Sequence, residues 1–130
     1  VFFFDAVPKS SMPEIVASID VSVIPLKKLD LFKGAIPSKI FENLAMKKPI
    51  LLGVEGEAKE LFIDEGHCGW GFEPENELDL AEKIKDIAKQ KDKLAELGNN
   101  GYSYVKSKFT RDIIAANFWD FLNQNVHEKN

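Results

Sequence analysis

The chain has 130 residues, 45% of them hydrophobic and 29% charged, with a formal net charge of -4 and a mean hydropathy of -0.19. This length suits one domain with a single core, and the balance of apolar and charged residues excludes a disordered chain. With a pI near 5.2 and Arg111 as its only arginine, the chain lacks the clustered positive charge of a general nucleic-acid binder. No apolar run approaches the roughly 20 residues that span a bilayer.

The start of the chain and its one cysteine indicate how much of the protein this sequence covers and in which compartment it folds. The first residue is Val1, and the chain opens in an apolar run, VFFF, without the pattern of a signal peptide. We therefore expect a piece of a longer protein. Cys68 cannot form an internal disulfide, which fits a reducing cytoplasm. It has no Cys or His partners at metal-ligand spacing, so neither Cys68 nor His67 predicts a metal site.

The first part of the chain predicts strands that alternate with helices. Val1 to Val7 is apolar enough for a strand buried on both faces of a parallel sheet. A helix capped by Ser10 or Ser11 should carry four apolar residues inward: Met12, Ile15, Val16 and Ile19. A second β-branched strand is expected within Val21 to Leu26, and a loop over Lys27 to Ala35.

The stretch from Gly34 to Pro49, GAIPSKIFENLAMKKP, predicts an amphipathic helix that begins near Pro37. Its apolar residues recur at helical spacing and leave Glu42 on the polar arc; they are Ile36, Ile40, Phe41, Leu44 and Ala45. A third buried strand is expected at Pro49 to Val54, followed by a helix over roughly Glu57 to Glu65 with Glu57 as its cap.

The second half reads as mostly helical after a short fourth strand around Trp70 to Glu73, where Trp70 should pack under the sheet edge. Three apolar stripes predict helices: Leu80, Ala81, Ile84, Ile87 and Ala88; Leu94, Leu97 and Val105; and Ile113, Ile114, Phe118, Phe121 and Leu122. Thr110 is a good N-cap for the last helix. Gly98 and Gly101 interrupt the second stripe, and since each glycine costs a helix about 1 kcal/mol relative to alanine, we expect a break or kink there.

This order of elements predicts an α/β fold, an open, doubly wound, Rossmann-like parallel sheet with a helical C-terminal tail. In such sheets ligands bind outside the carboxyl ends of the strands. Three loops should share that edge: Ala6 to Lys9, Pro25 to Ile36 and Glu55 to Glu57.

Several ligand-binding motifs are missing from the sequence. No GxGxxG follows a strand and no GxxxxGK[ST] occurs, and DxD, HExxH and GxSxG are also absent. What remains is the start of the helix near Pro37, where the open amides around Pro37, Ser38 and Lys39 predict an anion site. Glu42, one turn further along, can accept hydrogen bonds from sugar hydroxyls. Phosphate and ribose together suggest a nucleotide.

The residues also resemble a known family. PSKIFENLAMKKPI, the segment GEAKELFIDEGHCGWGFEP and the later LAELGNNGYSYVKSKFT look like the C-terminal, nucleotide-sugar-binding half of family 4 (group 1) glycosyltransferases with the two-domain GT-B fold. The resemblance covers nearly the whole chain and is closest to the bacterial capsule and O-antigen branch. It implies that residues 1–130 form a single, truncated donor domain without the N-terminal acceptor domain.

The resemblance also implies roles for individual residues. Glu42 matches the second glutamate of the family's EX7E motif, which binds the donor ribose, and Pro37, Ser38 and Lys39 lie where backbone amides face the donor diphosphate. Val7 and Pro8 match the loop that lines the base. The first motif glutamate would fall on Gly34, which is a departure, so contacts to the sugar are expected from the loop of Gly34, Ala35 and Ile36.

The function implied is transfer of a sugar, with retention and without a metal or other cofactor, from a UDP- or GDP-sugar to a cell-envelope polysaccharide or lipid-linked acceptor. A cytoplasmic location follows, with peripheral membrane association of the full-length protein and no nucleic-acid partner. Residues 1–130 alone should be inactive, because half of the cleft would be absent. Two alternatives stay open: a nucleotide-sugar epimerase of the same fold, and a non-catalytic nucleotide-binding module.

Overall fold

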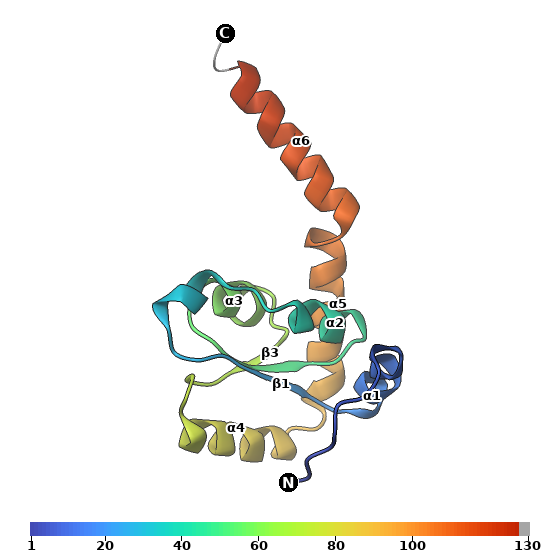
Figure 1. Cartoon of the computed structure of the whole chain (residues 1–130), viewed down its shortest axis with the longest axis vertical. Helices are drawn as coiled ribbons and strands as arrows, with labels where there is room; N and C mark the ends of the chain where they lie inside the picture. Colours follow the sequence, from blue (N-terminus) through green and yellow to red (C-terminus); the bar gives the residue numbers. More distant parts are fainter. Residues whose placement is uncertain (128–130) are drawn as a thin grey trace.

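The computed structural model describes residues 1–127 (Figure 1). The elements in chain order are η1 (Lys9–Ser11), α1 (Met12–Ser18), β1 (Ser22–Pro25), η2 (Asp30–Gly34), α2 (Ser38–Ala45), β2 (Ile50–Gly53), α3 (Glu57–Lys59), η3 (Glu60–Glu65), β3 (Gly69–Gly71), α4 (Glu77–Lys89), α5 (Lys93–Lys108) and α6 (Arg111–His127). Of these, η1 and η2 are 3-10 turns and η3 is a π-helical turn that continues α3.

The sheet of the described residues has three parallel strands in the order β1-β2-β3, as expected for a Rossmann-like fold. Ser22 pairs with Ile50, and Ile50 pairs with Gly69, so the three strands begin level with one another. Helices α2 and α3 cover one face and α4 covers the other (Figure 1). The short third strand begins at Gly69 and ends at Gly71, earlier than the span Trp70 to Glu73 predicted from the sequence.

Two apolar clusters hold these layers together, one on each face of the sheet. The larger lies between the sheet and the layer of α2, α3 and η3, and consists of Ile24, Ile40, Leu44, Ile50, Leu52, Val54, Ala58, Phe62 and Cys68. In the smaller, Leu51 packs with Phe72 and Ile87 beneath the opposite face. Successive side chains of β2 therefore alternate between the faces, as a strand requires. Trp70 packs against the smaller cluster, which confirms its predicted packing role.

Helix α5 is continuous, so the predicted break at its two glycines is wrong. Both glycines are buried, and they bring α5 against α2 and the turn that follows it. A Cβ added to Gly98 would lie 2.1 Å from the carbonyl oxygen of Lys47, and one added to Gly101 would lie 2.6 Å from Leu44 Cδ2. Close packing of α5 against α2 therefore offsets the loss of helix stability that the two glycines cause.

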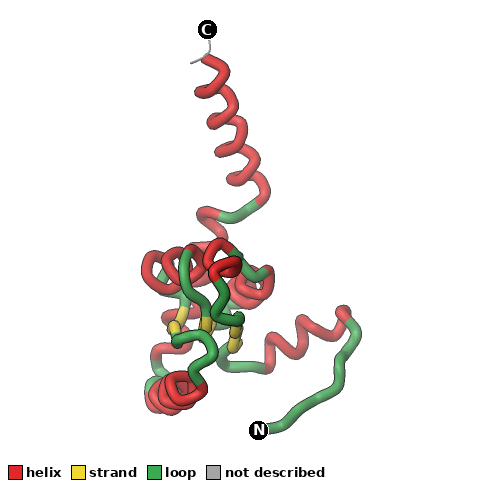
Figure 2. Tube along the Cα trace, turned by 60° about the vertical axis from the view of Figure 1, so that its left-hand side comes forward, coloured by secondary structure: helices red, strands yellow, loops and turns green. Residues whose placement is uncertain are grey.

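The predicted strand at Val1 to Val7 is also wrong. These residues have no regular structure, and the side chains of Val1 to Phe4 are at least 87% exposed. A strand is stable only when it pairs with others, and this segment runs beneath α1 without joining the sheet (Figure 2). Helix α1 forms where predicted, but Ser11 at its N-cap makes no side-chain capping hydrogen bond. The helix buries only Val16, while Met12 and Ile15 remain 39% exposed.

The last helix, α6, projects from the body of the molecule (Figures 1 and 2). Thr110 lies at its start, and its hydroxyl oxygen accepts a hydrogen bond of 3.4 Å from the amide of Ile113, as the predicted cap requires. Its apolar side chains Ile114, Phe118, Trp119 and Phe121 are 52–64% exposed. No helix within the described residues is both long enough and apolar enough to cross a membrane.

Candidate functional site

The start of α2 is the candidate site, because its amides are open. Pro37 occupies the N-cap position in an extended conformation, and within residues 1–127 no side chain caps the helix. The first helical hydrogen bond runs from the amide of Ile40 to the carbonyl of Pro37, at 3.1 Å. The amides of Ser38 and Lys39 therefore point out of the helix end, where the helix dipole favours an anion.

The opposite face of α2 fixes the helix in place. Ile40 and Leu44 are fully buried, and Asn43 is 5% exposed with its side-chain amide donating to the carbonyl of Lys39 at 2.8 Å. Ser38, Lys39 and Glu42 are exposed. The sequence pattern therefore placed Ser38, Lys39 and Glu42 correctly on the free face, with the Glu42 carboxylate one turn from the open amides, but Asn43, assigned to the same polar arc, is buried, and Ala45, assigned to the apolar face, is exposed.

A hollow of about 270 Å³ lies beside these amides, lined by β1 and the residues after it together with the start of α2 (Val23, Ile24, Pro25, Leu26, Pro37, Ser38 and Lys39). Its lining is mostly apolar, with polar groups only on the α2 side. Lys39, which lines the hollow, belongs to no ion pair of the described chain. Its ammonium group is thus free to meet an anion.

The loop predicted to face the sugar leads directly into α2. Gly34 ends η2, and a Cβ built on it meets nothing within 4 Å, so the position faces open space. Ala35 is half-buried, and Ile36 packs against the larger core cluster. In this segment the groups free to contact a ligand are therefore backbone groups rather than side chains.

Other predicted residues are not brought to this place. Val7 and Pro8 are exposed and precede α1, which lies at the opposite end of the sheet from η2 (Figure 1). His67, which an epimerase would need at the cleft, lies just before β3 and so at the amino end of that strand. Gly56 occupies the N-cap of α3, and Glu57 is the first helical residue and makes no capping hydrogen bond, so the predicted cap at Glu57 is wrong. Among the described residues no group of three His, Cys, Asp or Glu side chains could hold a metal ion.

The sequence did not predict one cluster of charged residues at the carboxyl edge of the sheet. Lys28, after β1, lies 2.9 Å from Glu73 and 3.7 Å from Glu55, which follow β3 and β2. The hydrogen bond from Asn76 and the nearby ammonium of Lys28 lower the pKa of Glu73, while Glu73 raises the pKa of Lys28. Since carboxyl ends of parallel strands meet at one edge, a charged residue after each strand was the available signal.

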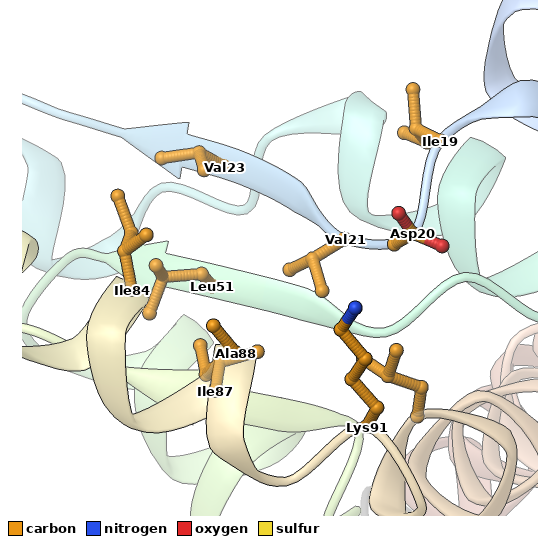
Figure 3. Close-up of a pocket in the computed structure, with 10 residues that line it drawn as sticks. Ile19, Asp20, Val21, Val23, Leu51, Ile84, Ile87, Ala88 and Lys91 are labelled. Atoms are coloured by element: carbon orange, nitrogen blue, oxygen red, sulfur yellow. The ribbon is translucent and has the colours of Figure 1, made fainter.

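A larger hollow of the described chain lies elsewhere, between the sheet and α4 (Figure 3), with a volume of about 540 Å³. Val21, Val23, Leu51, Ile84 and Ile87 give it an apolar lining. Asp20 and Lys91 lie at one end. It offers no row of open amides, and so the start of α2 remains the better place for a phosphate despite its smaller hollow.

The family profile described as "Glycosyl transferases group 1" matches residues 1–104, which include the sheet, α2 and the candidate site. The chain belongs to this family. No curated protein matches the chain at a significant level.

Two solved structures have the same fold as this group 1 chain. Sucrose-phosphate synthase from Thermosynechococcus elongatus aligns over 98% of the chain with 18% identity and a TM-score of 0.75. The HepE protein of Anabaena, solved in complex with UDP, aligns over 89% with 20% identity and a TM-score of 0.70. The chain spans 30% of the length of each. At these identities the likeness confirms the GT-B glycosyltransferase fold.

Proposed function

We propose that this chain is the donor-binding part of a glycosyltransferase that moves a sugar, with retention and without a metal, from a UDP- or GDP-sugar to a cell-envelope polysaccharide or lipid-linked acceptor. The observation that carries the proposal is the uncapped start of α2, with exposed Glu42 one turn along and a hollow beside it. The family match supports the transfer reaction. The UDP bound to the HepE protein makes UDP the first nucleotide to test.

Stabilisation of the leaving group is the chemistry that this site supplies. When the bond between the sugar's anomeric carbon and the diphosphate oxygen breaks, negative charge grows on the diphosphate. The amides of Ser38 and Lys39 are fixed in position by a helix whose other face is buried, so they need not reorganise as the charge develops. The ammonium of Lys39 adds positive charge, and Glu42 accepts hydrogen bonds from the ribose hydroxyls. Contacts to the sugar come from the backbone of Gly34, Ala35 and Ile36.

Replacing Ser38 tests the role of the backbone amides. Proline is tolerated at the first position of a helix and lacks an N–H group, and Pro37 already has the extended backbone that must precede a proline. Ser38→Pro therefore deletes one amide donor, while Ser38→Ala deletes only the hydroxyl. We expect Ser38→Pro to weaken UDP binding about tenfold or more, as for a lost hydrogen bond to a charged group, and Ser38→Ala to weaken it less.

Calorimetry with UDP and GDP on the protein expressed from its complete reading frame measures these effects. Glu42→Ala should also weaken binding about tenfold or more, and Glu82→Ala, at an exposed position on α4, should bind like the parent. If the parent binds neither nucleotide, the proposed function is wrong. If it binds but Ser38→Pro and Glu42→Ala bind equally well, the nucleotide site lies elsewhere.

A further inference from the structure

The connection between β1 and α2 must be held by its neighbours, because little of its own structure fixes it. Residues 26–37 contain only the 3-10 turn η2. Past β1, the sheet ladder reaches this connection only through the amide of Leu26, which donates to Gly53. The same connection ends in the open amides of α2. Whatever positions residues 27–36 therefore also shapes the proposed donor site.

Lys28 ties this connection to the loop that follows β3 through two different groups. Its backbone amide donates to Glu75 Oε2 at 2.9 Å, and its ammonium donates to Glu73 Oε1 at 2.9 Å. The ammonium also lies 3.7 Å from Glu55 Oε1, in the connection after β2. One lysine thus links the three loops at the carboxyl edge of the sheet.

The tie is anchored in the first turn of α4. Glu73 accepts a hydrogen bond of 2.8 Å from the side-chain amide of Asn76, and the Glu73 amide donates to Asp79 Oδ2 at 2.7 Å. Asn76 is the N-cap of α4, since its side-chain oxygen accepts from the Asp79 amide at 2.9 Å. The carboxylate that holds Lys28 is therefore itself held by a capped helix.

A second contact, independent of charge, holds the other end of the connection. Gly56 has φ +87°, and a Cβ there would lie 2.2 Å from the carbonyl oxygen of Lys33. The backbone of η2 therefore lies directly on the turn between β2 and α3. With Lys28 tied at one end and Lys33 packed at the other, the short segment from Gly34 to Pro37 has little freedom in how it enters α2.

We propose that Lys28 is a positioning residue, which latches the β1–α2 connection to the loops after β2 and β3 and so sets the geometry of the donor site. This inference rests on the proposed function for its ligand, but its structural claim concerns the unliganded protein. Lys28 acts through the connection and does not contact the nucleotide. Its side chain is 46% exposed, so the latch is modest in strength and sensitive to salt.

Hydrogen exchange and nucleotide binding together test the latch. In Lys28→Glu the ion pairs become repulsions, and we expect peptides covering residues 27–36 to exchange about fivefold faster without nucleotide, while β2 is unchanged. UDP binding should weaken by about the same factor. The swap Lys28→Glu with Glu73→Lys keeps the parent's net charge and should restore much of both. Lys85→Glu, at an exposed position on α4, changes the net charge equally and should alter neither.

The outcomes separate this proposal from the proposed function. Unchanged exchange over residues 27–36 in Lys28→Glu overturns the latch, whether or not the protein binds nucleotide. Faster exchange with UDP affinity unchanged, or equal losses of affinity in Lys28→Glu and the swapped variant, overturns the positioning role. If the parent binds no nucleotide but the exchange data follow the prediction, the proposed function fails and the latch stands.

Discussion

The two sides of α2 are held in different ways. Toward α5, two glycines leave no room for a side chain: a Cβ on Gly98 would clash with the carbonyl oxygen of Lys47, and one on Gly101 would clash with the Leu44 side chain. Toward the carboxyl edge of the sheet, α2 presents open amides and exposed side chains, and the neighbouring loops are joined by exposed ion pairs. One side therefore tolerates no added atom, and the other leaves room for a ligand.

This difference shows how a binding site can be both rigid and accessible. The seam between α2 and α5, defined here by Leu44, Lys47, Gly98 and Gly101, fixes the position of the helix. The seam therefore holds the helix itself, and the proposed Lys28 latch holds the connection that leads into its open amides. Substitutions that add atoms to the seam should cost stability, whereas substitutions at the open end should cost binding and little stability.

Gly98→Ala should give the largest effect. At an exposed helical position this change stabilises by about 1 kcal/mol, but here the new methyl group would lie 2.1 Å from a backbone oxygen that cannot move alone. We expect the free energy of unfolding to fall by about 3 kcal/mol, measured by urea denaturation. Asn99→Ala, at the next and exposed position of α5, is the control and should be neutral or slightly stabilising. A stabilised Gly98→Ala would show that the seam is loose.

The seam also shows where sequence reasoning reached its limit. Glycine costs helix stability locally, so Gly98 and Gly101 read as a break when α5 is considered alone. Their real role depends on α2, a helix some 50 residues earlier in the chain, and no local pattern carries that information. The strand predicted at Val1 to Val7 was wrong for a related reason. Its composition suits a buried strand, but a strand needs a partner to pair with, and composition does not supply one.

The candidate site was more predictable because its signals are local. The proline at the start of the helix and the helical spacing of apolar residues along α2 placed Ser38, Lys39 and Glu42 correctly on the exposed side. The roles given to these residues remain predictions. Lys28 was missed, since its partner Glu73 is distant in sequence and becomes a neighbour only through the sheet order.

Cys68 tests the packed side through pH. Its thiol is fully buried next to the seam, and burial raises its pKa from 9.0 to about 12. The folded state thus keeps a proton that the unfolded state loses first, so this contribution to stability is complete below pH 9 and is lost as the pH rises toward 12. Between pH 8 and pH 10 the parent should lose about 1 kcal/mol more unfolding free energy than Cys68→Ala. Equal losses in the two proteins would mean that solvent reaches the thiol.

Lys47 offers a smaller change at the same seam. It directly follows Met46, the C-cap of α2, and has φ 57°; the bonds from Lys47 N to Leu44 O and from Lys48 N to Asn43 O form a Schellman motif, in which this position favours glycine. Lys47→Gly should stabilise the protein by about 0.5 kcal/mol, the relief of strain exceeding the loss of the Lys47–Tyr102 cation–π contact. Lys47→Ala loses the contact but keeps the strain, so it should be destabilised; the reverse order in urea denaturation would refute this account.

Glu42→Ala should have the smallest effect on stability and thereby separates the two sides of α2 most sharply. Glu42 is exposed, makes no side-chain hydrogen bond or ion pair within the described residues, and alanine is at least as good a helix former. The free energy of unfolding should change by less than about 0.5 kcal/mol, while UDP affinity should fall about tenfold or more. Thermal unfolding measured with and without UDP gives both quantities in one experiment: the unliganded transition should match that of the parent, and the upward shift on adding UDP should shrink. If the unliganded protein is destabilised by as much as Gly98→Ala, Glu42 supports the fold, and the open side of α2 is not free for a ligand.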